Sequence, residues 1–248
     1  MSTSLETKDS DRWIPFLKRV PLFRPLCETD LRILAGDFRP CAYKKGEVVF
    51  RQDDTENSLY LIFEGQVRIY KLSPSGDETS INIFAAGDII GEFAAIDGQP
   101  RSATAITLRR CILLKMAGDQ MLQRMRAMPD LAISMARLLV TKVRWTAEYA
   151  ETIARYDAAG RLLHILLQYN QQFGQEKEKG KRYELDLGLN QADLATLVGA
   201  RREWVNRILR DWQQRGLILF EKDKLFILDL PRVIEEHDSR LEANTHLI

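Results

Sequence analysis

The sequence predicts an α+β protein that combines an antiparallel β-roll, a long helix and a carboxy-terminal winged helix-turn-helix. Three observations predict this fold: short apolar runs separated by glycines over 40–117, an unbroken helical pattern over 130–156, and a helix–glycine–helix–hairpin pattern over 184–230. The 248 residues are enough for two modest domains. We expect a sensor domain over 13–128, a dimerisation helix over 129–156, a winged helix-turn-helix domain over 157–230 and a carboxy-terminal tail over 231–248.

The composition is that of an ordinary globular protein with no global charge bias. Hydrophobic residues make up 45% and charged residues 29% of the chain, and 36 Lys and Arg against 35 Asp and Glu leave a net charge of +1. Any contact with nucleic acid must therefore come from a local patch. The chain lacks the apolar stretch of roughly 18 residues that spans a membrane and the apolar core of a signal peptide. We expect a cytoplasmic protein that does not bind membranes.

Neither a catalytic site nor a metal site is expected. The chain has three cysteines, Cys27, Cys41 and Cys111, and three histidines, His164, His237 and His246. The cysteines form no CxxC pair, and the histidines are too few and too scattered for a zinc site or a Ser-His-Asp triad. The sequence also contains no P-loop and no nucleophile–base pair, so we expect a binding protein and not an enzyme.

Residues 40–117 predict the β-roll. In runs such as SLYLIFEG, Leu59, Leu61 and Phe63 alternate with Tyr60 and Ile62, as the side chains on the two faces of a strand do. Glycines recur between the runs. Many short strands with regular turn signals are typical of a compact antiparallel roll or barrel. The sequence Pro74-Ser75-Gly76-Asp77 predicts a hairpin turn, because proline fixes φ and glycine supplies a positive φ.

The segment from Asp130 to Tyr156 lacks glycine and proline and predicts one helix of about 27 residues, roughly 40 Å long. Seven residues recur in it at alternating spacings of 4 and 3: Ala132, Ala136, Leu139, Val143, Thr146, Ala150 and Ile153. Such a seam is typical of paired helices, and we expect it to form a homodimer interface. The alternative is a core helix of a monomer. Thr146 favours the dimer, because a polar group in a seam needs a partner.

The segments that flank the carboxy-terminal motif are expected to be simple. Asp157–Gly160 predicts a hinge into a helix from Arg161 to about Gln172, and 174–182 predicts an exposed charged loop. The tail starts with Pro231 and predicts a short polar helix that frays.

Residues 184–230 predict the winged helix-turn-helix. Asn190, with Asp193 three residues later, is close to a capping box, and Gly199 supplies a sharp turn before a second helix that ends at Gly216. Two apolar runs then flank a charged turn, which is typical of a wing. The inner face of the first helix is expected to consist of Leu194, Leu197 and Val198.

The second helix of this motif carries the candidate DNA-binding residues. Over 199–216 there are five arginines, Arg201, Arg202, Arg207, Arg210 and Arg215, against Glu203 and Asp211. Arg can read guanine with two hydrogen bonds, and Glu can accept one from cytosine. The candidates at the start of the helix are Arg201, Arg202, Glu203, Asn206 and Arg207. A solvated, salt-bridged face is the alternative, but lopsided charge directly after the turn favours DNA.

Residues 87–105, GDIIGEFAAIDGQPRSATA, contain a second candidate site. Gly91 would let backbone N–H groups approach a phosphate, Arg101 would neutralise its charge, and Ser102 would donate a hydrogen bond to it. Glu92 could accept a hydrogen bond from a ribose hydroxyl. Each residue alone would be ordinary, but together they meet the needs of a cyclic sugar phosphodiester.

With both motifs in order on one chain, residues 15–230 resemble the catabolite activator (CRP/FNR) family of transcription regulators. GEF-x7-RSATA resembles the family's phosphate-binding cassette, VGARREWVNRIL resembles its recognition-helix signature, and the seam helix resembles its dimerisation helix. The resemblance implies a cyclic-nucleotide-binding β-roll, a two-fold dimer through 130–156, and double-stranded DNA with a palindromic operator as the partner.

The resemblance also assigns roles to residues. Glu92 would bind the ribose hydroxyl, and Arg101 and Ser102 would hold the cyclic phosphate. The backbone at Gly91 and Phe93 would line the same pocket.

Two further parts of the family pattern match this chain. Arg202, Glu203 and Arg207 match the base-reading trio, and Thr146 matches the purine-contacting threonine. Adenine-specific members often place serine after that threonine. This chain has Ala147 there, so cAMP and cGMP both remain candidates.

The resemblance implies no bound cofactor other than the effector. Relatives that sense oxygen or carbon monoxide need a cysteine cluster or a haem-ligating histidine. This chain lacks an N-terminal cysteine cluster, and its first histidine, His164, lies beyond the sensor domain.

We expect a homodimeric DNA-binding regulator gated by cAMP or cGMP. Two alternatives stay open: a regulator of the same fold that is ligand-independent or senses another effector, and a cyclic-nucleotide-binding module that controls a protein partner. The charged segment 174–182 is a candidate contact for RNA polymerase, as the corresponding region is in activators that the chain resembles.

Overall fold

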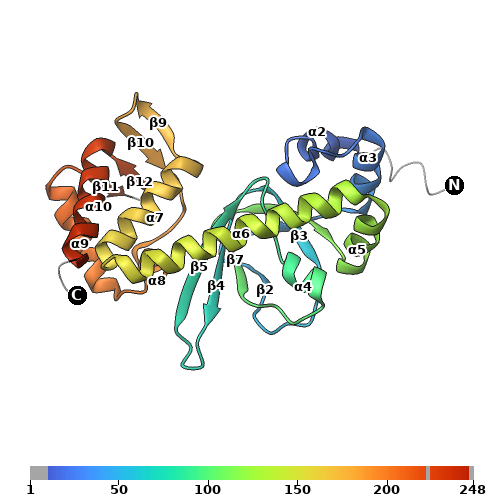
Figure 1. Ribbon diagram of the computed structural model, residues 1–248, viewed down its shortest axis with the longest axis horizontal. Helices are drawn as coiled ribbons and strands as arrows, with labels where there is room; N and C mark the ends of the chain where they lie inside the picture. Colours follow the sequence, from blue (N-terminus) through green and yellow to red (C-terminus); the bar gives the residue numbers. More distant parts are fainter. Residues whose placement is uncertain (1–10, 222–223, 246–248) are drawn as a thin grey trace. The chain divides into compact units, whose positions relative to one another are not determined.

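The computed structural model describes residues 11–221 and 224–245. It forms two compact units, one built from residues up to Asp77 together with Ile81–Arg144, and one built from Glu78–Ser80 and the residues from Trp145 onward. The helix α6 (Pro129–Arg155) begins in the first unit and ends in the second (Figure 1).

Short helical segments precede the roll. They are two 3-10 turns (Asp11–Trp13 and Pro21–Phe23), α2 (Ile14–Leu17) and α3 (Glu28–Asp37). Their apolar residues, such as Leu17 and Phe23, are fully buried in one cluster with Leu59 and Leu61 of the roll. Burial of large apolar side chains removes their surface from water, and it fixes these segments against the roll.

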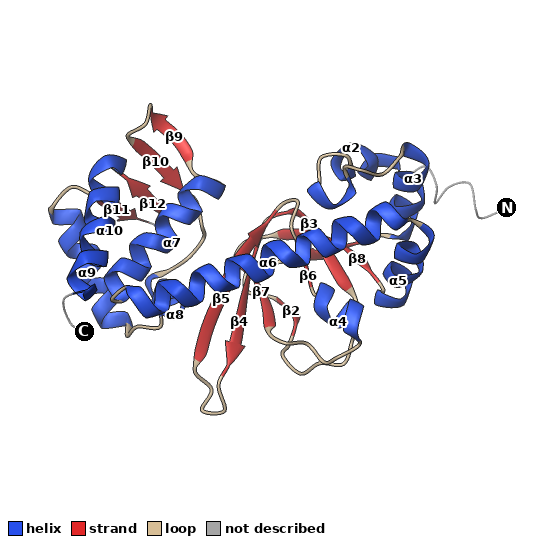
Figure 2. Cartoon of the chain, viewed as in Figure 1, coloured by secondary structure: helices blue, strands red, loops and turns tan. Residues whose placement is uncertain are grey.

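The roll consists of eight strands. They are β1 (Arg39–Tyr43), β2 (Val48–Phe50), β3 (Leu59–Glu64), β4 (Gln66–Leu72), β5 (Glu78–Ala85), β6 (Ile89–Ile90), β7 (Thr104–Thr107) and β8 (Cys111–Met116). Two four-stranded sheets form, with the orders β1-β8-β3-β6 and β2-β7-β4-β5, and the paired strands run antiparallel (Figure 2). Gly76 has a φ of 88° in the turn between β4 and β5. The antiparallel β-roll that the sequence predicts is confirmed.

Strand β3 is apolar on both of its faces because each face packs against a different cluster. Leu59 and Leu61 point into the cluster that includes the N-terminal helices, whereas Tyr60 and Ile62 point into the interior between the two sheets. Successive side chains of a strand face opposite sides, so both faces of this strand are buried. Two short helices complete the unit before α6: α4 (Glu92–Asp97) and α5 (Gly118–Ala127).

The second unit is a winged helix-turn-helix, as predicted. Its helices are α7 (Ala158–Phe173), α8 (Gln191–Val198), α9 (Arg202–Gln214) and α10 (Leu230–Thr245), and its strands are β9 (Gln175–Glu178), β10 (Arg182–Leu185), β11 (Ile218–Glu221) and β12 (Lys224–Ile227). The sheet has the order β11-β12-β10-β9. Asn190 and Asp193 form the expected capping box, and Gly199 adopts a φ of 64° between α8 and α9.

Two expectations about the flanking segments need correction, whereas the helix expected for the tail is present. Asp157 is the N-cap of α7, whose side chain accepts from the Gly160 backbone, so Gly160 lies inside the helix and is no hinge. The predicted loop 174–182 contains β9 and the start of β10, because backbone pairing does not depend on the polarity of the side chains. The polar tail forms α10, which packs against α7 and buries Val233 completely.

Candidate functional site

The candidate effector residues of the first unit gather where β6 meets α4. Gly91 adopts a φ of 77° directly before α4, so it turns the chain in a conformation that glycine tolerates best. Glu92 is buried in the first turn of α4, with only 3% of its surface exposed, whereas Phe93 is 46% exposed. Ser102 is exposed in the loop that leads into β7.

Arg101 lies beside this turn with a buried guanidinium group. Its Nη1 donates to the carbonyl oxygen of Gly91 at 2.8 Å, and its Nη2 donates to the carbonyl oxygen of Ser58 at 2.5 Å. The guanidinium carbon lies 4.2 Å from the centre of the Phe50 ring, in a cation–π contact. Nε is buried and finds no hydrogen-bond partner within the described residues.

The backbone of Arg101 is also fixed. Its N–H donates to the carbonyl oxygen of Asp54, and its own carbonyl oxygen accepts from Asp53. The loop between β2 and β3 therefore holds this residue from the main chain, while Gly91 and Ser58 hold it through its side chain. Motion of the guanidinium group is possible only if these side-chain hydrogen bonds exchange.

A lysine of α6 reaches the same site. The Nζ of Lys142 donates to Oε1 of Glu92 at 2.6 Å and to the carbonyl oxygen of Ile89 at 2.8 Å. It also lies 4.7 Å from the centre of the Phe84 ring. This cation satisfies a buried carboxylate that would otherwise be costly to keep away from water.

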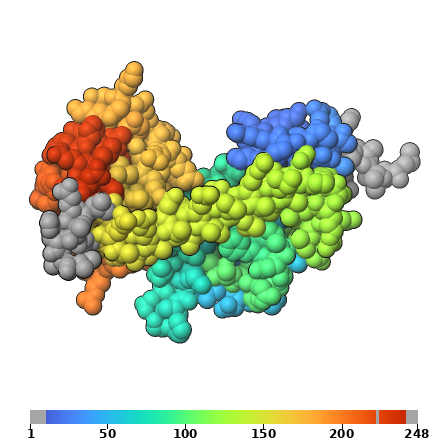
Figure 3. Space-filling model, in the orientation of Figure 1, coloured from blue at the N-terminus to red at the C-terminus, as the bar shows by residue number. Residues whose placement is uncertain are grey.

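Five of the seven residues of the predicted seam of α6 are exposed within the described part of the chain. Ala136, Val143, Thr146, Ala150 and Ile153 are exposed, and Ala132 and Leu139 are partly buried. Among the large apolar side chains whose burial the structure describes, that of Val143 is the most exposed, at 68%. Figure 3 shows one side of α6 as a yellow-green band at the surface of the chain. Thr146 and Ala147, both exposed, belong to the part of the helix that clusters with the second unit.

Helix α9 presents its charged face to solvent. Val205, Leu209 and Trp212 are buried on one side of the helix, and Trp212 is completely inaccessible. The exposed residues of α9 and its N-cap include four arginines and one glutamate: Arg201, Arg202, Glu203, Arg207 and Arg210. Asn206 is half-buried, so it stands at the edge of this face.

Arg215 is exposed as well, but its charge is paired with carboxylates of the second unit. It is the C-cap residue of α9, and its guanidinium group donates to the carboxylate of Asp211 at 3.2 Å and to that of Glu236 of α10. Its charge is therefore compensated within the second unit, and the positive face of α9 is smaller than the arginine count of the sequence indicates.

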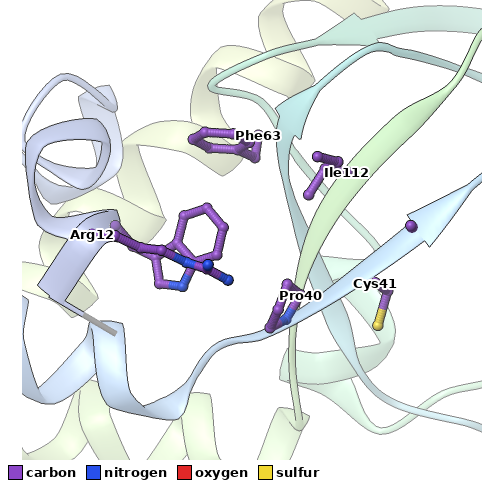
Figure 4. A pocket seen from close by; sticks show the side chains of 7 residues that line it. Arg12, Pro40, Cys41, Phe63 and Ile112 are labelled. Atoms are coloured by element: carbon purple, nitrogen blue, oxygen red, sulfur yellow. The ribbon is translucent and has the colours of Figure 1, made fainter. Parts of the chain in front are cut away.

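A separate pocket of about 420 Å³ lies at the edge of the first unit (Figure 4). Its lining residues are Arg12, Trp13, Pro40, Cys41, Ala42, Phe63 and Ile112. None of the candidate effector residues lines it. Within the part of the chain that the structure describes, no three His, Cys, Asp or Glu side chains are grouped to hold a metal ion, and no helix is long and apolar enough to cross a bilayer.

Comparison with known proteins finds a family match in each of the two halves of the chain. A family described as "Cyclic nucleotide-binding domain" matches residues 40–127, and one described as "Crp-like helix-turn-helix domain" matches residues 160–235. The CRP-like cAMP-activated global transcriptional regulator of Mycobacterium tuberculosis is 30% identical over 217 residues, which cover 88% of this chain and 96% of the relative. The chain belongs to the CRP family of transcription regulators.

A further relative and a solved structure show how far the similarity extends. The cyclic AMP receptor protein of Thermus thermophilus is 26% identical over 202 residues, covering 82% of this chain and 89% of the relative. The solved structure of the c-di-GMP responsive global regulator CLP of Xanthomonas campestris is 20% identical, covers 82% of this chain and 99% of that chain, and has a TM-score of 0.69. The latter likeness establishes a shared fold.

Sequence reasoning missed two residues that contact the candidate effector residues. Lys142 lies four residues before Thr146 on the long helix, and a charged residue on the inner side of that helix was the available signal. Glu56 lies 3.5 Å from Arg101 through their Oε2 and Nη2 atoms, but it is 45 positions away in the sequence and belongs to no motif. Only the folded roll brings these groups together.

Proposed function

We propose that this CRP-family regulator is a homodimer gated by a cyclic nucleotide, either cAMP or cGMP. Arg101 and Ser102 would hold the cyclic phosphate, Glu92 would accept a hydrogen bond from the ribose hydroxyl, and the backbone at Gly91 and Phe93 would line the pocket. The observation that carries the proposal is the buried guanidinium of Arg101, which donates to the carbonyl oxygen of Gly91, the residue that directly precedes the buried Glu92. A buried cation next to a glycine turn is suited to bind a phosphate.

The effector would act on the pairing of two α6 helices. The exposed seam supports a homodimer, because Val143 and Ile153 are apolar side chains that a second helix would cover. Thr146 and Ala147 would contact the purine base, so the effector would bind one helix packing better than another. Such a difference shifts the population toward the favoured packing, and a coupling of about 1–3 kcal/mol is enough for a useful switch.

The two recognition helices would read a palindromic operator. Helix α9 supplies Arg202, Glu203 and Arg207 for base edges, with Arg201 and Asn206 beside them. Dimer packing would place two copies of α9 about 34–36 Å apart, which lets both enter successive major grooves. Because DNA is the target, we place the protein in the cytoplasm, and the proposed activity is regulated binding and not enzymatic catalysis.

Selection of duplexes from a randomised pool, with no nucleotide, with cAMP and with cGMP, tests the proposal. A selected palindromic duplex is then titrated under the same three conditions by fluorescence anisotropy. We expect one cyclic nucleotide to tighten binding at least tenfold, which corresponds to about 1.4 kcal/mol. Equal affinity under all three conditions would favour the alternative, a regulator without a ligand or with another effector. If no duplex is bound under any of the three conditions, the result would favour the other alternative, a module that controls a protein partner.

The hairpin of β9 and β10 is the candidate contact for RNA polymerase. The four residues of β9 are exposed, and the charged side chains of Glu176, Lys177 and Glu178 protect this edge strand from pairing with other strands. Charges on an exposed edge also offer a surface to a protein partner. Replacement of the β9 charges by Gln and Ser should lower transcription from a bound promoter while operator affinity stays constant. Unchanged transcription would remove this partner from the proposal.

A further inference from the structure

The buried guanidinium of Arg101 has a carboxylate near it in addition to its carbonyl partners. Oε2 of Glu56 lies 3.5 Å from Nη2 of Arg101, while the two other acceptors of this side chain are the backbone carbonyls of Gly91 and Ser58. The side chain of Arg101 is 1% exposed and that of Glu56 is 46% exposed. Glu56 therefore reaches from the solvent side toward a cation that is otherwise enclosed.

Three neighbours hold the Glu56 carboxylate in this position. The Nζ of Lys115 on β8 lies 2.6 Å from its Oε1, Ser58 donates to the same oxygen at 2.7 Å, and the Tyr60 hydroxyl donates to Oε2 at 3.4 Å. Burial opposes ionisation, but the bonds from Lys115 and Ser58 outweigh it and lower the pKa of Glu56. Burial and the nearby Glu56 charge raise the pKa of Tyr60 to about 12, so this hydroxyl stays a donor.

An anionic effector would meet this carboxylate at Arg101. A phosphate needs the guanidinium donors that now point to Ser58 and Glu56, and two negative groups on one buried cation repel each other. The repulsion acts over a few ångströms in a partly buried site, where charges are screened less than in water. The carboxylate must therefore move away, or its charge must be neutralised, before the phosphate is bound well.

We propose that Glu56 is a built-in competitor of the effector: it neutralises Arg101 while the effector is absent and weakens effector binding by the work needed to displace it. Lys115 is a positioning residue that acts through Glu56. The inference rests on the proposed function in one respect, that the anion which displaces Glu56 is a cyclic nucleotide. The device would set the effector concentration at which the regulator responds.

Calorimetric titration with cAMP and with cGMP tests the proposal on four forms of the full chain: wild type, Glu56→Gln, Lys115→Met and the double variant. Gln keeps the shape of Glu56 and one acceptor oxygen for Lys115 and Ser58, but it removes the charge and the acceptor that faces Arg101, so we expect roughly 5- to 20-fold tighter binding. Lys115→Met should weaken binding about 2- to 5-fold, because the released carboxylate then pairs with Arg101 alone. In the Glu56→Gln background the same change should have little effect.

Two controls separate these effects from general ones. Glu64→Gln removes the same charge from an exposed position at the far end of β3, and it should leave the affinity unchanged. Glu56→Ala replaces Glu56→Gln if the latter fails to fold, as judged by circular dichroism. If Lys115→Met weakens binding equally in both backgrounds, Lys115 acts directly on the nucleotide and its assignment as a positioning residue is overturned.

Inorganic phosphate distinguishes failure of this inference from failure of the proposed function. Its binding is followed as a phosphate-dependent rise in Tm, against sodium chloride of equal ionic strength. If the wild type binds neither cyclic nucleotide but Glu56→Gln gains stabilisation by phosphate, the inference stands and the nucleotide assignment fails. If Glu56→Gln matches the wild type with both nucleotides and with phosphate, the carboxylate does not compete and the inference is overturned.

Discussion

The Nζ of Lys142 lies 2.6 Å from Oε1 of Glu92, so the long helix α6 pairs directly with the carboxylate proposed to bind the effector's ribose. Glu92 has a side chain that is 4% exposed, and that of Lys142 is 22% exposed. A hydroxyl that approaches this carboxylate must share it with the lysine or displace it. The same ion pair therefore contributes to folding and would link the proposed effector pocket to α6, the proposed dimerisation helix.

Removal of the lysine alone should destabilise the first unit. Lys142→Met leaves the buried Glu92 carboxylate without its cation, and the expected loss is about 3 kcal/mol of unfolding free energy. Urea denaturation followed by circular dichroism measures it. The double variant with Glu92→Gln removes the unpaired charge and should recover most of the loss. A double variant as unstable as Lys142→Met would mean that the lysine acts through packing on Phe84.

A methyl group at Gly91 should disable the effector pocket. Gly91→Ala places Cβ 2.5 Å from Nη1 of Arg101 and 3.0 Å from the carbonyl oxygen of Ser58, so the guanidinium must move. Gly98→Ala is the matched control at the other end of α4, with a φ of 69° and open space around the added carbon. Both changes carry a backbone cost of about 1–2 kcal/mol.

Calorimetry should therefore separate the two glycine variants. We expect at least tenfold weaker cyclic-nucleotide binding for Gly91→Ala and less than a twofold change for Gly98→Ala. Equal loss in both variants would assign the effect to the backbone of α4 and not to the position of Arg101.

How much the sequence could predict depends on whether a feature is local. The alternation in LYLI predicts β3, since its two sets of side chains fill two different interiors, and the cap at Asn190 predicts the start of α8. The GEF-x7-RSATA motif brought Gly91 and Arg101 together as candidates, and the structure places them in contact. These features depend on spacing within a short segment.

The rest depended on contacts between distant residues. Lys142 and Glu92 are 50 positions apart, and Glu56 and Arg101 are 45 apart, so no local pattern could pair them. Strand β9 is exposed along its whole length and is held by backbone pairing with β10, and its charged side chains gave no strand signal. Arg215 was counted on the DNA-facing side because Glu236, its partner, lies in a later helix.

Stability of the second unit should fall in mild acid. Burial lowers the pKa of His164, assisted by the nearby His237, and Nε2 of His164 has no hydrogen-bond partner within the described chain. The unfolded chain, with a pKa of 6.5, then binds more protons than the folded one. The unfolding free energy contributed by neutral His164 is fully present above pH 6.5 and is lost as the pH falls below that value.

Urea denaturation of the wild type and of His164→Phe at pH 7.5 and pH 5.5 checks this sign. The phenyl ring keeps an aromatic contact with Tyr156, whose ring centre lies 6.0 Å from that of His164, and it cannot take up a proton. The variant should lose less stability between the two pH values than the wild type. If the wild type and the variant lose the same unfolding free energy between these pH values, a group other than His164 is responsible for the pH dependence.

Removal of one arginine at the start of α9 should affect specific and non-specific DNA binding differently. Arg202 is exposed in the first turn of this helix, where a recognition helix meets base edges. Arg202→Ala should cost about 1–3 kcal/mol on the selected duplex and far less on a scrambled duplex. Arg210→Ala, further along the same exposed face, is the control. Equal losses on both duplexes for Arg202→Ala would make Arg202 a phosphate contact.

A charge on the seam of α6 should separate the subunits without unfolding them. Val143 is 68% exposed within one chain, so Val143→Asp removes little burial from the chain itself. In a paired seam the new carboxylate would be buried without a cation, and two copies would face each other across the two-fold axis. We expect the dimer Kd to rise at least 100-fold, or by about 2.7 kcal/mol. Sedimentation equilibrium measures the dimer, and urea denaturation confirms that the fold is kept.

Thr141→Asp supplies the control for this variant, because it adds the same charge to an exposed position of α6 outside the seam. It should leave the Kd unchanged. In addition, Val143→Asp should bind a single half-site as well as the wild type does and lose the advantage of the full palindrome, since two linked reading helices bind with a raised effective concentration. A wild type that stays monomeric with both effector and duplex present, or a Val143→Asp variant that dimerises normally, would contradict the assignment of the seam.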